Sequence, residues 1–422
     1  MTASTMPDPT QSKWTSAGSP VFTVLIPTMN RPQLLAAAVE TVLWQTFKDF
    51  ELIVSDNSND EACTTQNRAI VERHADDPRV HYIRPQIWLN MPDHWEFASR
   101  HASGRYVVIL TDRHVMRPSA LEFLNAQIAQ LQDDGLVISW RSDSTFTTGV
   151  VRTGSFTGTT EVIESQELIS DYVKFATWRS SPAWVNRLPR PLTGCYRSDV
   201  AHIIREKHGR LFMPIAPDYT SAYLLLAYTR RVAYLDRPLI MSHGDQSNGK
   251  NVLVYDRDEY LSSLGDVDLF AGTPVPLGTV TNYVVRDLMM VRSLVGARYP
   301  KFTLDLVGYF MCNYAELMHM QRLGSLRDVG ALYAQWWDGI QMLSSEQQKQ
   351  IKEYVNELEK QRVSLIGLRR LAVRLGLDPL YHSVVRAVRH IRHRLAKKPV
   401  YADVLEAAMQ TDYMISSDRA IQ

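Results

Sequence analysis

The sequence predicts an α/β protein in which a Rossmann-like, mixed or mostly parallel sheet is flanked by helices and followed by an α-helical C-terminal region. Short runs rich in β-branched residues alternate with helical patterns from Val21 onward, which is typical of right-handed βαβ units. Beyond about residue 255 nearly every apolar spacing is helical. The chain has 422 residues, more than a single hydrophobic core usually holds, so two structural units are expected.

The first unit begins with four strands that alternate with four helices. Strands are predicted at 21–27, 50–56, 80–85 and 105–112, and helices at 32–45, 61–75, 92–102 and 118–132. Ligands of open α/β sheets bind outside the carboxyl ends of the strands. The residues to examine for function therefore follow the strands, at 27–31, 55–60, 84 and 111–114.

The chain between residues 136 and 250 combines a polar stretch with further helices and a strand. Residues 136–163 are polar and of mixed periodicity, which favours hairpins or a loop. A turn and a helix are predicted at 191–209, and a helix at 216–228 carries Asp218 near its N-terminus. A strand at 230–242 then leads into the polar loop HGDQSNGKN.

The domain boundaries follow from these patterns. Residues 1–20 are rich in Ser, Thr and Pro and are predicted to form a flexible tail. The α/β domain is predicted to span 21–255 and a helical domain 256–422, because the pattern breaks near GTPVPLG. Helices of the second domain are expected at 281–299, 304–320 and 328–343.

Composition and charge exclude several classes of protein. With 45% hydrophobic and 22% charged residues and a net charge of +1, the chain is neither disordered nor fibrous, and its charge names no partner. Cys63, Cys195 and Cys312 are widely spaced, form no metal-type pair and fit a reducing cytosol. The sequence shows no apolar run long enough to span a membrane and no secretory signal. The expected location is the cytoplasm, or the inner face of the cytoplasmic membrane as a peripheral protein.

Three polar residues after the first two strands suit a nucleoside diphosphate. Asp56 ends the strand FELIVSD, and its carboxylate can accept the N–H of a pyrimidine; the alternative is a turn-forming role. Thr28 and Arg31 follow the first strand and can border the base and the phosphates.

Three further residues are candidates for chemistry. Asp112 follows the apolar strand YVVIL and should project into the crevice, whereas the alternative is a cap for the helix that begins near Pro118. Asp218 opens a helix, where the helix dipole favours a carboxylate, so capping and catalysis are compatible. His243 ends the last strand before a Gly-, Ser- and Asn-rich loop, where a neutral imidazole can coordinate a divalent ion or contact a phosphate.

Taken together, these segments resemble bacterial family 2 glycosyltransferases, inverting enzymes of the GT-A fold that build cell-surface polysaccharides. The resemblance is carried, in this order, by residues 24–60, 81–121, 216–226 and 236–249. It implies that Pro27, Thr28, Arg31 and Asp56 hold the nucleobase and that Arg84 lies near the nucleotide. It also implies a nucleotide-sugar donor, UDP- or dTDP-linked, and a hydroxyl of a glycan or lipid-linked acceptor.

The sequence departs from the family pattern at Asp112-Arg113-His114. The family carries two or three consecutive acids there, the last of which binds a divalent metal such as Mn²⁺ or Mg²⁺. One interpretation is an altered metal site that uses Asp112, His114 and His243. Another is that Arg113 or a neighbouring cation neutralises the diphosphate without metal. A third is that catalysis is lost while nucleotide binding remains.

Asp218 is similar to the catalytic base of the family, which deprotonates the acceptor hydroxyl for direct displacement with inversion at the anomeric carbon. The family more often carries an acidic pair, of which Pro217-Asp218 retains one carboxylate. His243 with Ser247 is similar to a late loop that closes over the pyrophosphate.

The leading hypothesis is therefore an inverting, hexosyltransferase-like enzyme of surface polysaccharide biosynthesis. The alternative is a catalytically impaired GT-A scaffold that binds nucleotide or glycan in an assembly complex. A sugar-nucleotide nucleotidyltransferase would need a Gly-rich phosphate loop near the N-terminus, which this sequence lacks.

The C-terminal region contains a basic segment. Residues 360–398 carry eleven Lys or Arg residues and one acid, Asp378, and their apolar residues recur at helical spacing. Such a helix can lie on an anionic membrane surface, or pack on its own domain with a solvated basic face. No nucleic acid is expected as a partner, because no recognition motif accompanies the charges. Trp336 and Trp337 lie in apolar stripes that predict core packing or a subunit interface, so a homo-oligomer through the helical region is one expected state.

Overall fold

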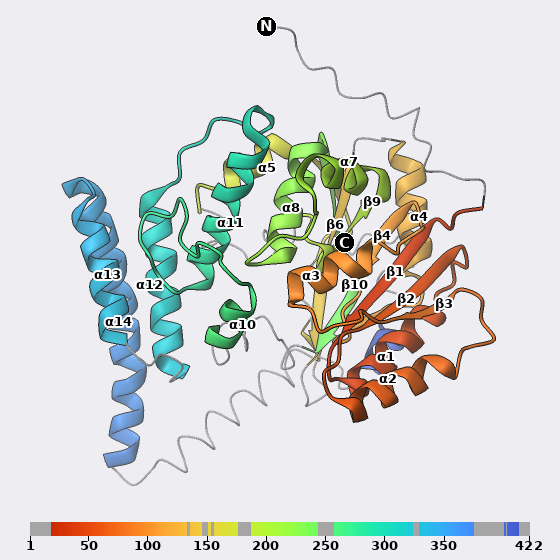
Figure 1. Cartoon of the computed structure of the whole chain (residues 1–422). Coiled ribbons are helices and arrows are strands. Elements are labelled where there is room, and N and C mark those ends of the chain that lie inside the picture. Colours follow the sequence, from red (N-terminus) through yellow and green to blue (C-terminus); the bar gives the residue numbers. More distant parts are fainter. Residues whose placement is uncertain are drawn as a thin grey trace, which may run out of the picture.

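The computed structural model describes residues 18–132, 136–145, 151–152, 156–175, 187–243, 257–323, 329–374, 401 and 403–412. In this part of the chain, a sheet with its flanking helices forms one side of the molecule, and a group of long helices forms the other (Figure 1). The predicted fold class is confirmed, because a mixed α/β sheet is followed by a helical C-terminal region.

The described strands form a single ten-stranded sheet. Their order is β3-β2-β1-β4-β9-β6-β10-β5, with β7 paired to β6 and β8 paired to β10. β1 to β4 pair in parallel, as do β6 and β10, whereas β5, β7, β8 and β9 pair antiparallel to their neighbours. The strands are β1 (Phe22–Thr28), β2 (Phe50–Asp56), β3 (Val80–Ile83), β4 (Tyr106–Ile109), β5 (His114–Met116), β6 (Leu136–Thr145), β7 (Val151–Arg152), β8 (Thr160–Glu164), β9 (Gly194–Arg197) and β10 (Arg231–His243).

Helices cover both faces of this sheet, and the alternation of side chains along β1 shows why. Val24 and Ile26 pack in one buried cluster with Leu35 of α1, whereas Leu25 points to the other face and packs in a second cluster with Trp95 of α3. The helices are α1 (Pro32–Leu43), α2 (Glu61–Glu72), α3 (Met91–Ser99), α4 (Ala120–Leu131), α5 (Ser165–Tyr172), α7 (Ser198–His208), α8 (Pro217–Tyr228), α10 (Arg257–Ser263), α11 (Val280–Val295), α12 (Leu306–Leu323), α13 (Val329–Gln341), α14 (Ser345–Arg374) and α16 (Val404–Gln410).

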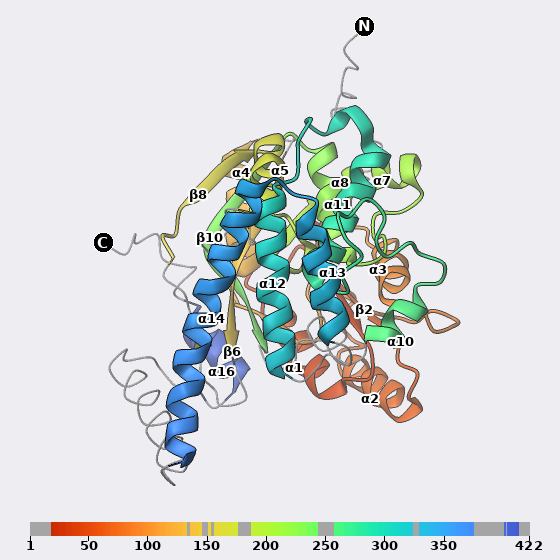
Figure 2. The ribbon, with the colours of Figure 1, turned by 90° about the vertical axis from the view of Figure 1, so that its left-hand side faces the viewer.

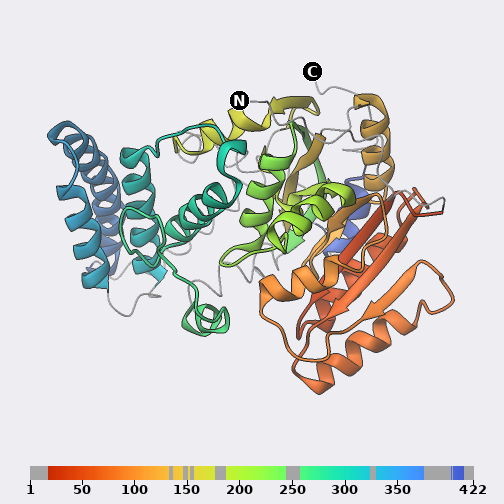
Figure 3. The same cartoon turned by 45° about the horizontal axis from the view of Figure 1, so that its top comes forward.

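The second cluster continues from the sheet into the helical region. It joins Leu25 of β1 and Leu225 of α8 to Val284 of α11, Leu317 of α12 and Trp336 of α13. Figures 1 and 3 show the resulting layers, with α11 and α12 between α8 and the outer pair α13 and α14. Figure 2 shows α13 and α14 as neighbours of α12 on the outer side. The helical region and the α/β region therefore share one continuous apolar core.

Two strands, β5 and β9, were not predicted from the sequence: β5 is short, and β9 occupies the place of the predicted turn before α7. The antiparallel pair of β6 and β7, and the strand β8, lie in or at the end of the stretch 136–163, where hairpins or a loop were expected. β9 reaches the centre of the sheet because it begins with glycine. A Cβ on Gly194 would lie 2.6 Å from the carbonyl oxygen of Ile138 and 3.0 Å from that of Arg190, so a larger residue would displace the backbone.

The end of the chain returns to the sheet, which was also not predicted. Val404 and Ala407 of α16 pack in a buried cluster with Val115 of β5 and Met241 of β10. The fully buried Arg117 donates from Nε to Oγ1 of Thr411, at 3.0 Å. This return supports the edge of the sheet that carries His114.

Part of the predicted basic segment lies outside the described residues. The backbone of α14 is helical to Arg374, and most of residues 360–398 follow it. Among the described residues, no helix combines the length and apolar character that crossing a bilayer requires.

Candidate active site

The carboxyl ends of β1 and β2 place two predicted residues side by side. Thr28 and Asp56 are register partners of the two parallel strands, and both are buried; Pro27, also buried, pairs with Ser55. Asp56 is 0% exposed and accepts hydrogen bonds from the backbone N–H of Ser58 (2.9 Å) and the hydroxyl of Tyr82 (2.7 Å). These bonds fix the orientation of the carboxylate at the edge of the sheet.

Tyr82 was missed by sequence reasoning. Burial, and then the hydrogen bond to Asp56, raise the pKa of its hydroxyl, so Tyr82 remains a donor at neutral pH. The guanidinium of Arg68 lies 4.9 Å from the centre of the Tyr82 ring and supports its other side. The sequence pattern around Asp56 does not indicate that Tyr82, on the next strand, donates a hydrogen bond to it.

The loop after β2 brings Arg84 into the same region. The side chain of Asn57 bonds both the N–H and the carbonyl of Leu89, which fixes the loop against the segment before α3. The exposed Arg84 donates from Nη2 to the carbonyl oxygen of Ser58, at 2.9 Å. The hydroxyl oxygen of Ser58 accepts from the backbone N–H of Asn30 in the loop after β1, at 2.9 Å. Two loops are thereby joined next to Asp56.

Asp112 lies between β4 and β5 and is 6% exposed. Its Oδ2 accepts from the hydroxyl of Thr28 (3.0 Å), and its Oδ1 lies 3.1 Å from Nη1 of Arg31. Helix α4 begins at Ala120 with Ser119 as its N-cap residue, so Asp112 does not cap it. Burial raises the pKa of Asp112, and Arg31, Thr28 and Arg113 oppose this shift. Asp112 thus connects the ends of β1 and β4 and is not the N-cap residue of α4.

Arg113 is half-buried and follows Asp112 directly. Burial lowers the pKa of its guanidinium to about 10, with Arg31 and Arg190 acting in the same direction and Asp112 and Asp218 opposing it. A group with this pKa remains cationic at neutral pH. Arg113 is therefore within electrostatic reach of two other arginines and of both predicted carboxylates.

His114 begins β5 and is 3% exposed. Its Nδ1 lies 2.6 Å from Oγ1 of Thr111. Burial, followed by the charges of Arg113, His243 and Arg190, lowers the pKa of His114 well below its usual value, so its imidazole is neutral at pH 7. The backbone N–H of His243 donates to the carbonyl oxygen of Arg113, at 3.0 Å. The paired strands β5 and β10 thus bring the two histidines near each other.

Two of the predicted metal ligands, Asp112 and His114, already contact neighbouring side chains. Within the described part of the chain, no group of three or more His, Cys, Asp or Glu side chains is arranged to hold one. The carboxylate of Asp112 already contacts Thr28 and Arg31, and Nδ1 of His114 contacts Thr111. The assignment of Asp112, His114 and His243 as metal ligands gains no support here and stays a prediction. Ser247 lies outside the described residues.

Asp218 occupies the first turn of α8, where the N-terminal end of the helix dipole favours a carboxylate. Its Oδ2 lies 3.6 Å from Nη1 of Arg190, and the two side chains are 18% and 17% exposed. Burial raises the pKa of Asp218, while Arg190, the N–H groups of Asp218 and Tyr219, and Arg113 oppose the shift. A carboxylate with a raised pKa is a stronger proton acceptor, which suits a general base.

Arg190 is a second residue that sequence reasoning missed. Its guanidinium lies 5.2 Å from the centre of the Tyr219 ring, and its buried Nε has no hydrogen-bond partner among the described residues. It precedes β9, the strand whose position was not predicted. An arginine in a predicted turn carries no sequence signal, so only the sheet topology places Arg190 beside Asp218.

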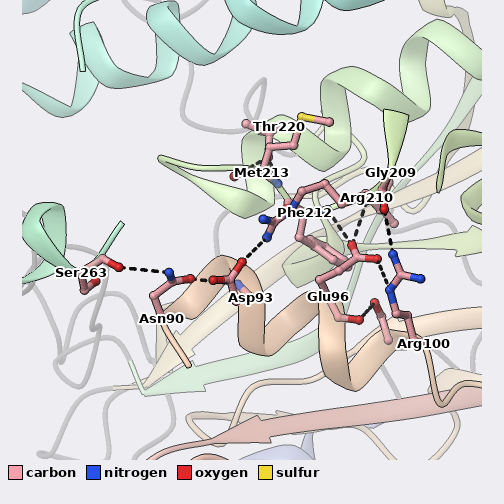
Figure 4. A network of polar contacts seen from close by, with 12 residues as sticks. Asn90, Asp93, Glu96, Arg100, Gly209, Arg210, Phe212, Met213, Thr220 and Ser263 are labelled. Carbon is pink, nitrogen blue, oxygen red and sulfur yellow. Dashed lines mark hydrogen bonds and ion pairs between the residues drawn. The ribbon is translucent and has the colours of Figure 1, made fainter. Parts of the chain in front are cut away.

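The segment that leads into α8 is held from one side by Glu96 of α3 (Figure 4). Oε2 of this buried glutamate accepts the N–H groups of Leu211 (2.8 Å) and Phe212 (3.1 Å). Oε1 lies 2.7 Å from Nε of Arg205 and 2.9 Å from Nε of Arg100. Each oxygen of Glu96 is therefore paired with two donors.

The same segment is held from the other side by Asp287 of α11. This residue is 0% exposed and accepts the N–H groups of Ile215 (2.9 Å) and Ala216 (2.8 Å). Burial raises the pKa of Asp287 to about 6, although the two N–H groups and Arg286 act in the opposite direction. A helix of the C-terminal region thus fixes the backbone immediately before Asp218.

The chain resembles known proteins over part of its length. Residues 23–181 match the model of a family described as glycosyl transferase family 2, which confirms the resemblance drawn from the sequence. A curated protein of Campylobacter jejuni, the GalNAc(5)-diNAcBac-PP-undecaprenol beta-1,3-glucosyltransferase, is 34% identical over 108 residues, which is 25% of this chain and 33% of that protein. An uncharacterized protein of Sinorhizobium fredii is 30% identical over 125 residues, 29% of this chain and 13% of that protein. The alignments thus span a third or less of these relatives.

Solved structures to which the chain has a weak similarity include TarS of S. aureus. The structure of a TarS fragment in complex with UDP-GlcNAc has a TM-score of 0.44 and 15% identity, with 87% of this chain and 91% of that chain covered. The same fragment in complex with UDP has a TM-score of 0.43 and 15% identity, with 80% and 91% covered.

Proposed function

We propose, from the match of residues 23–181 to the model of glycosyl transferase family 2, that the protein transfers a sugar from a nucleotide-sugar donor to a hydroxyl of a glycan or lipid-linked acceptor, with inversion. The observation that carries the proposal is the placement of Asp218. This carboxylate lies in the first turn of α8, next to Arg190 and within electrostatic reach of Arg113. The name of the Campylobacter relative, with a PP-undecaprenol substrate, supports a lipid-linked acceptor.

The donor is proposed to bind across the ends of β1 and β2. Asp56 supplies an oriented carboxylate for the N–H of a pyrimidine base, which favours a UDP- or dTDP-sugar. Thr28 neighbours Asp56 across the pair of β1 and β2 and contacts Asp112, which Arg31 also contacts; we assign this row of side chains to the path from base to diphosphate. Arg84, which donates to the carbonyl oxygen of Ser58 in the loop after β2, supplies a further cation.

The proposed reaction is a single displacement. Asp218 takes the proton of the acceptor hydroxyl as the hydroxyl oxygen forms a bond to the anomeric carbon. The bond between that carbon and the diphosphate oxygen breaks at the same time, and the electron pair leaves with the nucleoside diphosphate. Because attack and departure occur on opposite faces, the anomeric configuration is inverted. A location at the cytoplasmic face of the membrane fits such an acceptor and is part of the proposal.

Asp218→Asn tests the base directly. The amide is similar in size but cannot accept the proton, so we expect nucleoside diphosphate release to fall by about 10²- to 10⁴-fold with donor binding retained. The release is measured with purified protein, a panel of UDP- and dTDP-sugars and a membrane extract as the acceptor source.

The matched control is Asp199→Asn, because Asp199 also lies in the first turn of a helix, pairs with an arginine and is 16% exposed. Full turnover by Asp218→Asn would exclude this residue as the base. Binding of a donor by the wild-type protein without any turnover would instead favour the alternative, a nucleotide-binding scaffold.

A further inference from the structure

The cations around Asp112 and Asp218 outnumber the carboxylates. The guanidinium of Arg31 pairs with Asp112 and that of Arg190 with Asp218. Arg113 lies within electrostatic reach of all four groups. No described carboxylate comes within ion-pair distance of the Arg113 guanidinium itself. The five side chains therefore carry one positive charge in excess, in a setting that is partly shielded from water.

Two of these arginines also have enclosed N–H groups without an acceptor. Nη2 of Arg31 and Nε of Arg190 are buried and make no hydrogen bond to a described residue. Buried donors without partners are unfavourable, so their presence in a native site indicates a ligand that supplies acceptor oxygens. One of these arginines, Arg31, pairs with Asp112, and the other, Arg190, pairs with Asp218.

A diphosphate would supply the negative charge and the acceptor oxygens that this group of arginines lacks. It carries negative charge and several acceptor oxygens, and the planar guanidinium fork matches phosphate geometry. A metal ion would instead meet three cations and a carboxylate, Asp112, whose oxygens already contact Thr28 and Arg31. The departure from consecutive acids at Asp112-Arg113-His114 replaces potential metal ligands with a cation at the same place.

We propose that Arg31, Arg113 and Arg190 bind the donor diphosphate and neutralise the charge that forms on it as the anomeric bond breaks, so that transfer proceeds without a divalent metal. The inference rests on the proposed glycosyl transfer and adds how the leaving group is stabilised. Arg190 has a further role as the residue that contacts both the base and the leaving group. In this arrangement the proton goes to Asp218, and the electron pair goes to a diphosphate held by guanidinium donors.

The experiment measures binding and turnover separately. Each measurement is made once with EDTA and once with Mn²⁺ or Mg²⁺ in place of the chelator. Binding of UDP, dTDP, uridine, thymidine and inorganic pyrophosphate is followed by calorimetry. We expect the nucleoside diphosphates to bind equally well, within about twofold, with and without chelator. Arg190→Gln and Arg113→Gln should each weaken binding of the nucleoside diphosphate and of pyrophosphate by about tenfold or more, and leave nucleoside binding unchanged.

Arg187→Gln is the matched control for Arg190→Gln. Arg187 also pairs with one carboxylate, Glu161, at 2.8 Å, and its guanidinium lies 5.1 Å from the ring centre of Tyr234. This control should bind all probes as the wild type does. Because Arg113 is half-buried in a loop, Arg113→Gln provides a second test if Arg190→Gln fails to fold, which thermal unfolding reports.

The outcomes separate this inference from the proposed function. Metal-independent binding that the arginine variants lose, without turnover by the wild type, would support the diphosphate site and overturn the proposed transfer. Turnover that stops in EDTA and returns with Mn²⁺ would overturn the metal-free site and keep the proposed transfer. Diphosphate binding that is unchanged in both arginine variants would also overturn the site.

Discussion

The two sides of the candidate active site are assembled by different means. On the donor side, Thr28 and Asp56 are register partners, so the pairing of β1 and β2 alone places them together. On the base side, the backbone before Asp218 is held by carboxylates from two helices distant in sequence, Glu96 of α3 and Asp287 of α11. The difference predicts that donor-side substitutions affect ligand binding, whereas base-side substitutions lower both stability and activity.

The largest effect is expected for Glu96→Ala. This change leaves the N–H groups of Leu211 and Phe212 without their acceptor and leaves Arg205 without its carboxylate. Breaking a buried ion pair by removing one partner typically lowers stability by about 3–5 kcal/mol. Urea unfolding measures the change, and donor turnover should fall with it.

Glu206→Ala is the control for Glu96→Ala, because Glu206 lies on α7 with its side chain 64% exposed and pairs only with His202 among the described residues. Its effect should stay below about 0.5 kcal/mol. Equal stability of Glu96→Ala and Glu206→Ala would contradict this difference between the two sides, because the backbone before Asp218 would then not depend on Glu96.

A smaller effect is expected for Asp287→Asn. An amide oxygen in the place of Oδ2 can still accept both N–H groups, but the amide nitrogen in the place of Oδ1 then faces the donors Ile215 N–H and Arg286 Nη1. This should lower the free energy of unfolding by about 1–3 kcal/mol at pH 7. The rate of donor turnover should also fall, because the backbone before Asp218 shifts. Asp338→Asn, an exposed substitution on α13, is the control for both measurements.

The pH dependence of stability sharpens this prediction. Burial raises the pKa of Asp287 from its ordinary value of 3.8 to about 6, so between these pH values the folded protein keeps a proton that the unfolded chain has lost. The contribution of Asp287 to the free energy of unfolding therefore falls as the pH rises from about 4 to 6, and is constant above. The stability difference between wild type and Asp287→Asn should narrow from pH 4.5 to 7. A difference that stays constant, or widens, would contradict the raised pKa.

The smallest effect on stability is expected for Asp56→Asn on the donor side. Tyr82 can still donate to the amide oxygen, so the free energy of unfolding should change by less than about 1 kcal/mol. The affinity for UDP should fall by about tenfold, or ~1.4 kcal/mol, because the base N–H loses a charged acceptor. Calorimetry measures the affinity, with Asp77→Asn, before the opposite end of β3, as the control. Loss of stability without loss of affinity would reverse the assigned roles of the two sides.

The positions of Thr28 and Asp56 on the proposed donor side could be predicted from the sequence because their signals are local. The runs at 21–27 and 50–56 became β1 and β2, and the polar residues directly after them lie at one edge of the sheet. Asp112 was expected to project into a crevice at the strand ends, and the structure shows it in contact with Thr28 and Arg31. These outcomes follow from strand periodicity and from the parallel order of βαβ units.

The base side could be predicted only at Asp218. The sequence placed this residue at a helix N-terminus but gave no sign of Arg190, which precedes the unpredicted strand β9, or of the buried Glu96 and Asp287. Charged residues in amphipathic helices usually face solvent, so their pattern does not distinguish a buried carboxylate from an exposed one. The packing of α16 on β5 and β10 could not be predicted either, because the sequence of a short helix does not indicate which distant strands it contacts.

The sequence by itself determined the α/β fold class, the order of its first strands and helices, and the polar residues at the ends of β1 and β2. Those features depend on periodicity and turn chemistry within short windows of the chain. The tertiary structure decided which cations lie near Asp112 and Asp218, and that helix α11 of the C-terminal region holds the backbone before Asp218. The physical reason is that ion pairing and burial depend on distances between residues far apart in sequence, and only the packed sheet and helices set those distances.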